Sequence, residues 1–126
     1  MKTFLQLMLI VLSLGQIQAQ TDSSVFSSIS VFFQQNDYEK LAAQFAETLD
    51  LTIGDTDGTY GKQQATILIK SFFGENKTTS FIIKHKGSSN ERTHYAVCDL
   101  KSGNKNWSVY ILLGKNSKII QLQIEE

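Results

Sequence analysis

Residues 93–113, THYAVCDLKSGNKNWSVYILL, decide the fold of this chain. Apolar and polar side chains alternate on both sides of the short segment SGNK, and such alternation is typical of β-strands that have one face in a core. SGNK itself has the length and composition of a hairpin turn. We therefore predict an antiparallel hairpin in which Cys98 faces the core and Asp99 faces water.

Two further strands extend this hairpin into a four-stranded meander. Residues 81–86 precede it and residues 118–125 follow it, across the polar turn segments GSSNER and GKNS. The more apolar set of side chains in each strand should face inward. This inward set comprises Phe81, Ile83, His85, His94, Ala96, Cys98, Leu100, Trp107, Val109, Ile111, Leu113, Ile120, Leu122 and Ile124. The set expected in water includes Lys84, Lys86, Asp99 and Lys101.

Three segments ahead of the meander have the apolar spacing of helices. The first spans Val25 to Phe33, the second is capped by Asp37 and continues to Phe45, and the third runs from Ala65 to Phe72 with Gly74 just past its end. Residues 49–53, LDLTI, alternate as a short strand and are followed by a turn. The predicted fold is therefore α+β, with three N-terminal helices packed on a curved antiparallel sheet in the order ααβαββββ.

The segment GTYGKQQ, residues 58–64, resembles two binding loops but fits neither. A phosphate-binding loop needs four residues between its glycines and a hydroxyl after the lysine, whereas Gly58 precedes Gly61 by three positions and Gln63 follows the lysine. A calcium loop of the EF-hand type would need oxygen ligands at Ile53 and Gln64. We expect a helix start here, with no metal, no cofactor and no catalytic residue.

The N-terminus has the pattern of a secretory signal peptide. Lys2 precedes an apolar run that ends at Leu14, which is shorter than a membrane span, and small residues lead to Ala19. We predict cleavage after Ala19, a single domain over residues 20–126, an exported protein that is periplasmic or secreted, and no membrane association after cleavage. Cys98 is the only cysteine, so no internal disulfide can form, and we expect a buried thiol.

Charge is balanced over the chain but unevenly distributed. Residues 20–75 carry three basic and eight acidic side chains, whereas residues 76–126 carry eight basic and four acidic ones. The near-neutral total argues against a nucleic-acid partner. The opposite signs of the two halves favour attraction between them or between two copies, although solvated faces without a partner have the same pattern.

The two histidines are the exceptions on the inward face. In a regular hairpin centred on Ser89 and Asn90, His85 and His94 would lie opposite each other near the turn. Such a pair could bind a metal, move a proton or hydrogen-bond a ligand, and strand-end histidines can equally be half exposed and inert. Pairing of Cys98 with either histidine as a nucleophile is a further alternative, although no feature of the sequence stabilises a thiolate.

The order of elements, with GTYGKQQATILIKSFF entering the third helix, resembles the nuclear transport factor 2-like superfamily. LDLTI, YGKQQA, SFF, FIIKHKGSS and VYILLGKNSKIIQLQIEE resemble, more narrowly, a family of small exported bacterial proteins known only as a domain of unknown function. The resemblance implies a cone-shaped sheet with an internal cavity, in which some superfamily members isomerise or dehydrate substrates while others bind ligands or dimerise through the sheet. Acids expected inside an isomerase cone are replaced here by apolar residues.

These features favour a non-catalytic module that binds a small apolar ligand in the cone. Tyr60, His85, His94 and Trp107 are the residues expected near its mouth. A homodimer through the outer sheet face, which carries Tyr95, Val97, Tyr110 and Leu112, is compatible with this role. The alternative is an isomerase- or dehydratase-like enzyme that uses the histidine pair.

Overall fold

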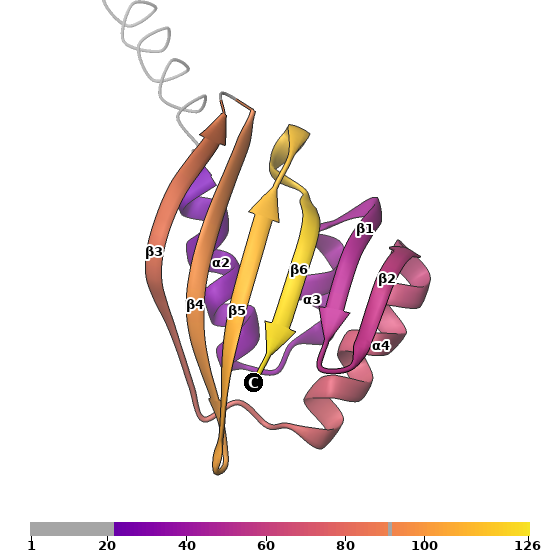
Figure 1. Ribbon diagram of the computed structural model, residues 1–126, viewed down its shortest axis with the longest axis vertical. Helices are drawn as coiled ribbons and strands as arrows, with labels where there is room; N and C mark the ends of the chain where they lie inside the picture. The colour runs from indigo at the N-terminus through magenta and orange to yellow at the C-terminus, as the bar shows by residue number, and fades with distance from the viewer. Residues whose placement is uncertain (1–21, 91) are drawn as a thin grey trace, which may run out of the picture.

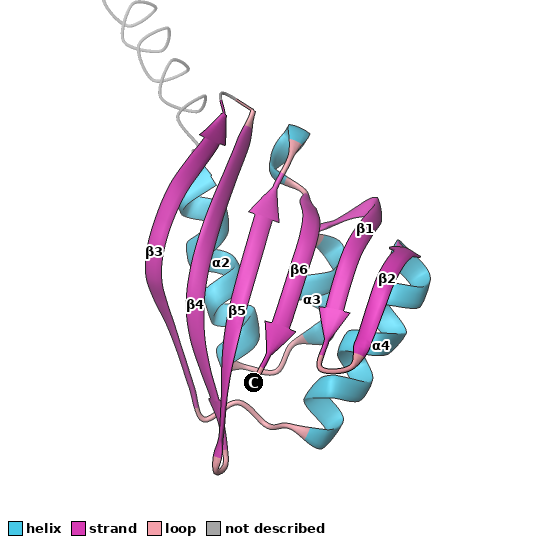
Figure 2. Ribbon diagram, in the orientation of Figure 1, coloured by secondary structure: helices cyan, strands magenta, loops and turns pink. Residues whose placement is uncertain are grey.

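The computed structural model describes residues 22–90 and 92–126, in which three helices lie along one face of a six-stranded sheet (Figures 1 and 2). The elements in chain order are α2 (Asp22–Gln34), α3 (Tyr38–Ala43), β1 (Phe45–Ile53), β2 (Thr56–Gly61), α4 (Lys62–Glu75), β3 (Ser80–Asn90), β4 (Thr93–Ser102), β5 (Lys105–Leu113), the 3-10 turn η1 (Lys115–Ser117) and β6 (Ile119–Glu125). The predicted signal peptide, residues 1–19, falls outside the described residues. No helix in the described ranges is long and apolar enough to cross a bilayer.

The sheet has the strand order β2-β1-β6-β5-β4-β3. Neighbouring strands are antiparallel except β1 and β6, which are parallel, so the sheet is mixed and not wholly antiparallel as predicted. The predicted α+β class, the three helices and the C-terminal meander are confirmed. The structure adds one strand, β2, between the predicted first strand and the third helix.

The strand β2 was predicted as a turn and a helix start because its sequence, TDGTYG, is polar and carries two glycines. It pairs antiparallel with β1 across a turn in which Gly54 has a positive φ of 57°. On the outer face, Thr52 Oγ1 donates to Asp57 Oδ1 and Thr59 Oγ1 donates to Asp50 Oδ1, both at 2.8 Å. Cross-strand hydrogen bonds therefore stabilise a strand that has no apolar alternation.

The helix ends are partly as predicted. Asp37 caps α3, since its carboxylate accepts a hydrogen bond from the Lys40 amide at 3.1 Å. Phe45 is not on that helix but is the first residue of β1, where its side chain is buried. Gly74 lies inside α4 without a positive φ, and the helix ends one residue later, where the Asn76 amide donates to the Phe72 carbonyl at 2.8 Å.

Side-chain alternation in β4 and β5 is as predicted. Cys98 is fully buried, whereas Asp99 is exposed and lies 3.7 Å from Lys84 Nζ. The core between the sheet and the helices comprises Phe26, Ile29, Phe33, Leu41, Ala42, Phe45, Leu49, Leu51, Ala65, Ile69, Phe72, Phe73, Phe81, Ala96, Cys98, Leu100, Trp107, Val109, Ile111, Leu113, Ile119, Leu122 and Ile124. The strands β3 and β4 bend around α2 (Figure 1). Between them the Phe33 ring of α2 contacts the rings of Phe81 and Phe73.

A bulge in β3 overturns the predicted position of His85. Ile83 lies opposite Cys98, but His85 lies opposite Val97, so the pairing shifts by one residue at Lys84. A bulge places two consecutive side chains on one face of a sheet. His85 therefore shares the outer face with Lys84 rather than facing the core.

The same bulge moves Lys86 to the helix side of the sheet. Lys86 lies opposite Ala96, and its Nζ donates to Ser23 Oγ on α2 at 2.8 Å. The prediction that Lys86 lies on the outer face was therefore wrong. A second irregularity, where β5 meets β6, buries Ile119 completely and leaves Ile120 half-buried, although the sequence pattern predicted Ile120 in the core.

Candidate functional site

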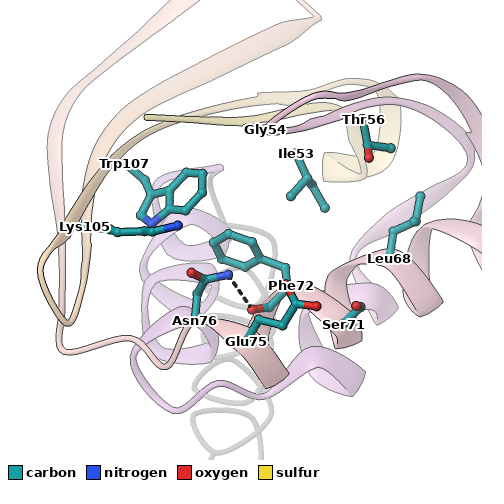
Figure 3. Close-up of a pocket in the computed structure, with 10 residues that line it drawn as sticks. All are labelled: Ile53, Gly54, Thr56, Leu68, Ser71, Phe72, Glu75, Asn76, Lys105 and Trp107. Atoms are coloured by element: carbon teal, nitrogen blue, oxygen red, sulfur yellow. Dashed lines mark hydrogen bonds between the residues drawn. The ribbon is translucent and has the colours of Figure 1, made fainter.

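A pocket of about 480 Å³ opens between α4 and the sheet, at the end of the molecule where the β1–β2 and β4–β5 hairpins turn (Figure 3). The β1–β2 hairpin contributes Ile53, Gly54 and Thr56; α4 and its C-cap contribute Leu68, Ser71, Phe72, Glu75 and Asn76; and the β4–β5 hairpin contributes Lys105 and Trp107. Three segments far apart in the sequence thus form one hollow.

The inner wall of the pocket is aromatic and aliphatic. Leu68 and Phe72 are four residues apart on α4, so both point from the same face of that helix. The Phe72 ring meets the Trp107 ring edge to face, with centroids 5.2 Å apart and planes at 80°. Ile53 faces them from the end of β1 (Figure 3). An apolar part of a ligand could be buried against this wall.

Trp107 also carries an unsatisfied polar group. Its side chain is only 7% exposed, and its Nε1 has no hydrogen-bond partner among the described residues. A buried donor that makes no hydrogen bond costs about 1–3 kcal/mol, and such groups are uncommon in folded proteins. Figure 3 shows the nitrogen on the edge of the ring that faces Lys105 and Asn76, two residues of the pocket lining.

The side chain of Lys105 covers this indole. Its Nζ lies 5.6 Å from the centroid of the Trp107 ring, which is cation–π distance, and 3.4 Å from a carboxylate oxygen of Glu126. More than half of the Lys105 side chain is exposed. The ammonium group can therefore leave the indole and keep a charged partner.

Two smaller hollows adjoin the pocket and share Trp107 with it. One, of about 370 Å³, is lined by Gly54, Asp55, Glu125 and Glu126 in addition to the indole. The other, of about 350 Å³, lies along the outer side of the β4–β5 hairpin and also includes Glu126. Trp107 thus lines three hollows at one end of the protein.

The four residues predicted at the mouth of a cone do not form one site. Trp107 lines the pocket described above, and Tyr60 is half-buried in β2, opposite Leu49. His85 lies on the outer face, where its Nε2 is 3.2 Å from the Tyr95 hydroxyl. His94 lies near the β3–β4 turn, at the opposite end of the sheet from the pocket (Figure 1).

The predicted pairing of His85 with His94 is wrong. The β3–β4 register pairs Ile83 with Cys98 and shifts by one residue at Lys84, so His94 lies opposite Ser88, whose Oγ lies 3.2 Å from His94 Nδ1. The other ring nitrogen of His94 lies 3.3 Å from Asp22 Oδ2. The two imidazoles thus have different partners on different faces, and an acid–base mechanism that needs both in one cavity has no geometric basis here.

Asp22 connects the first turn of α2 to the β5–β6 connection as well as to His94. Its second oxygen accepts a hydrogen bond from Ser117 Oγ. These residues line a hollow of about 390 Å³ with Arg92, Gly114, Lys115 and Asn116. The contacts join α2 to two turns of the sheet, so they have a structural explanation.

The thiol of Cys98 is poorly suited to act as a nucleophile in this fold. Burial and, to a smaller extent, the neighbouring charge of Asp99 together raise the pKa of this thiol from 9.0 to about 12. A thiol with this pKa is protonated at neutral pH. Within residues 22–90 and 92–126, no group of three or more His, Cys, Asp or Glu side chains is placed to hold a metal ion.

Trp107, a predicted site residue, lines the pocket, but the other polar residues of its lining were not predicted from the sequence. Glu75 and Lys105 are charged residues beside loops, a position typical of any solvated surface. They become neighbours only because the end of α4 packs beside the β4–β5 turn. No local signal in the sequence could have identified them.

A family model described as DUF4783, a domain of unknown function, matches residues 26–125. Among curated proteins, none matches this chain significantly. Crystal structures of DUF4783 family proteins from Bacteroides ovatus and Bacteroides uniformis are both 23% identical to the chain over 78% of its length. They superpose with TM-scores of 0.71 and 0.72, and the match covers 91% and 93% of their own chains.

The fold is also found outside that family. An NTF2-like protein of unknown function from Cytophaga hutchinsonii superposes with a TM-score of 0.60 at 11% identity, over 85% of this chain and 91% of its own. At such low identity the likeness establishes the fold alone. The predicted nuclear transport factor 2-like architecture is confirmed.

Proposed function

The chain belongs to the DUF4783 family, and we propose that it is a non-catalytic binding protein whose pocket beside Trp107 takes up a small amphipathic molecule. The observation that carries this proposal is the composition of the pocket, in which an aromatic wall and an unpartnered indole N–H meet a rim of polar side chains. Ligand sites commonly combine apolar walls with a few convergent polar groups in this way.

The size of the pocket supports a small ligand. Its volume of about 480 Å³ lies within the range of about 300–1,000 Å³ that is typical of small-molecule sites. Of the four residues predicted for ligand binding, the proposal keeps Trp107 and replaces Tyr60, His85 and His94 by Glu75 and Lys105. No proton transfer or covalent step is required of any of them.

The single tryptophan makes the proposal testable. Binding of amphipathic compounds should shift the one indole N–H resonance in a proton–nitrogen NMR spectrum. Ser71→Phe should abolish binding because Ser71 lines the pocket. Ile67→Phe, on the same helix but 60% exposed and outside the lining, should leave binding intact. The proposal would be contradicted if no compound shifted the indole N–H resonance, or if Ser71→Phe bound the compounds as tightly as the unmodified protein.

The outer face of the sheet carries aromatic and exposed aliphatic side chains, which favour self-association through this face. On that face the Tyr95 and Tyr110 rings are stacked with centroids 6.0 Å apart, and Ile82 and Val97 beside them are 54% and 36% exposed. We propose that a second copy of the chain covers this surface.

Charge complementarity supports a second copy as the occupant. Asp50 and Asp57 lie on the outer face at the β1–β2 side. Lys84 and Lys101 lie at the β3–β4 side, where Asp99 is the ion-pair partner of Lys84. A two-fold axis parallel to the central strands would set the acidic side of one copy against the basic side of the other.

Sedimentation velocity would test this second proposal. Ile82→Lys should shift a dimer to monomer, whereas Val31→Lys, a similar change at an exposed position of α2, should not. A protein that stays monomeric at high concentration would contradict it. We further propose, from the signal-peptide pattern of residues 1–19, that the protein acts in the periplasm or outside the cell.

A further inference from the structure

We infer that the pocket beside Trp107 selects an organic cation: an ammonium group on an apolar body, with a hydroxyl or carbonyl acceptor close to the charge. This inference rests on the proposed function and names the class of ligand. It follows from the charges around the pocket, from the cation already seated on the indole, and from the unpartnered indole N–H.

The α4 side of the pocket is negative. Glu75 lines it and forms no ion pair within residues 22–90 and 92–126. The last turn of α4 contains no basic residue, so the negative end of the helix dipole reinforces the charge of Glu75. A cation bound in the pocket would be stabilised by the charge of Glu75 and by the dipole of α4.

The hollow that adjoins the pocket adds more negative charge. Asp55, Glu125 and Glu126 line it, and Gly54 and Trp107 belong to both spaces. Among the described residues that line these two spaces, Lys105 is the one that is basic, and Glu126 forms an ion pair with it. A cation that enters either of these two spaces is therefore attracted, and an anion is repelled.

The indole already carries a cation in the structure. Lys105 Nζ lies 5.6 Å from the centroid of the Trp107 ring, and an ammonium group from a ligand could take the same position. Lys105 would then move toward Glu126, from which it is only 3.4 Å away. The exchange keeps both positive charges paired.

The unpartnered N–H group of the Trp107 indole is the reason for proposing an acceptor oxygen in the ligand. Trp107 is more than nine-tenths buried, and its Nε1 lacks a partner on the edge of the ring that faces the pocket residues Lys105 and Asn76 (Figure 3). Once Lys105 moves, a hydroxyl or carbonyl oxygen of the ligand can accept this hydrogen bond. Acidic residues alone would attract any cation, whereas this buried donor selects one with an adjacent oxygen.

Four phenyl compounds of similar size separate the possibilities: phenylalaninol, phenethylammonium, phenethyl alcohol and hydrocinnamate. Titrations to about 10 mM would follow the indole N–H resonance and detect dissociation constants in the millimolar range. The expected order of affinity is phenylalaninol, phenethylammonium, phenethyl alcohol, hydrocinnamate. Tighter binding of hydrocinnamate than of phenethylammonium would overturn the inference while leaving the proposed function standing. Equal affinity for phenylalaninol and phenethylammonium would contradict the part of the inference that requires an acceptor oxygen in the ligand.

Variants supply the second arm of the test. Lys105→Gln should strengthen phenethylammonium binding about two- to five-fold, because it removes the competing ammonium from the indole. Glu75→Gln should weaken it by a similar factor, and Glu47→Gln, which removes the same charge from an exposed position outside the pocket lining, should not. Weaker cation binding by Lys105→Gln would contradict the inference. If none of the four compounds shifts the resonance, the proposed function fails with it.

Discussion

The Phe33 ring on α2 stacks on the Phe81 ring on β3, with centroids 4.4 Å apart and planes within 9° of parallel. Phe33 also meets Phe73 of α4 edge to face, with centroids 5.5 Å apart. The fully buried side chain of Phe33 therefore connects α2 both to α4 and to β3, the edge strand of the sheet. The packing of α2 against the bent end of the sheet depends on it.

Replacing Phe33 should be severe. Phe33→Ala should lower the free energy of unfolding by about 3–5 kcal/mol, because it removes a buried ring and leaves a cavity. Urea denaturation followed by circular dichroism would measure the loss. Val31→Ala, at a position of the same helix that is 42% exposed, should change stability by less than about 0.5 kcal/mol. Equal effects of the two variants would contradict the packing described here.

Gly54, which lines the pocket, and Gly74, which lies in α4, should respond oppositely to replacement by alanine. Gly74→Ala should stabilise the protein by about 0.5–1 kcal/mol, since Gly74 lies in helical backbone and an added Cβ meets nothing within 4 Å. Gly54→Ala should destabilise it, because Gly54 has a φ of +57° although its surroundings are open. Thermal unfolding of both variants would show whether the backbone conformation of the glycine alone decides if alanine stabilises or destabilises the protein.

The thiol of Cys98 should be unreactive in the folded protein. A thiol reagent at neutral pH should label it only after unfolding, because the thiol is buried and its raised pKa keeps it protonated. Rapid labelling under native conditions, at a rate independent of denaturant, would show that β4 exposes this residue.

Cys98 should also affect stability at alkaline pH. The pKa is about 12 in the folded state and near 9.0 for an exposed thiol. Because the pKa is raised in the folded state, the protonated thiol makes its full contribution to the free energy of unfolding below pH 9. This contribution is lost as the pH rises toward 12. The difference in unfolding free energy between wild type and Cys98→Ala should therefore shrink over that interval and stay constant below it.

Processing of the N-terminus is a separate prediction. Mass spectrometry of the protein expressed in its native host should give a chain that begins at Gln20, and Ala19→Arg should prevent the cleavage. A mature chain that keeps residues 1–19 would contradict the proposed export.

Sequence analysis predicted the meander well because alternation has a direct physical cause. Each side chain of a strand points opposite to its neighbours, so the run from Ala96 to Leu100 identifies the buried face without reference to anything distant. The same rule failed at His85, because a bulge adds one residue to β3 and reverses the faces beyond it. The register also separates the two histidines, because the pairing of Ile83 with Cys98 would place His85 opposite Ala96, not His94, even without the bulge.

The fold class, the burial of Cys98 and the three helices could be predicted from the amino-acid sequence, because periodicity and capping are local properties. The parallel pairing of β1 with β6, the strand β2 and the pocket arise only when the elements pack together. Glu75, Lys105 and Trp107 come together there because the end of α4 packs beside a hairpin turn some thirty residues further along the chain. A contact of that kind depends on how whole elements pack, and no short stretch of sequence encodes it.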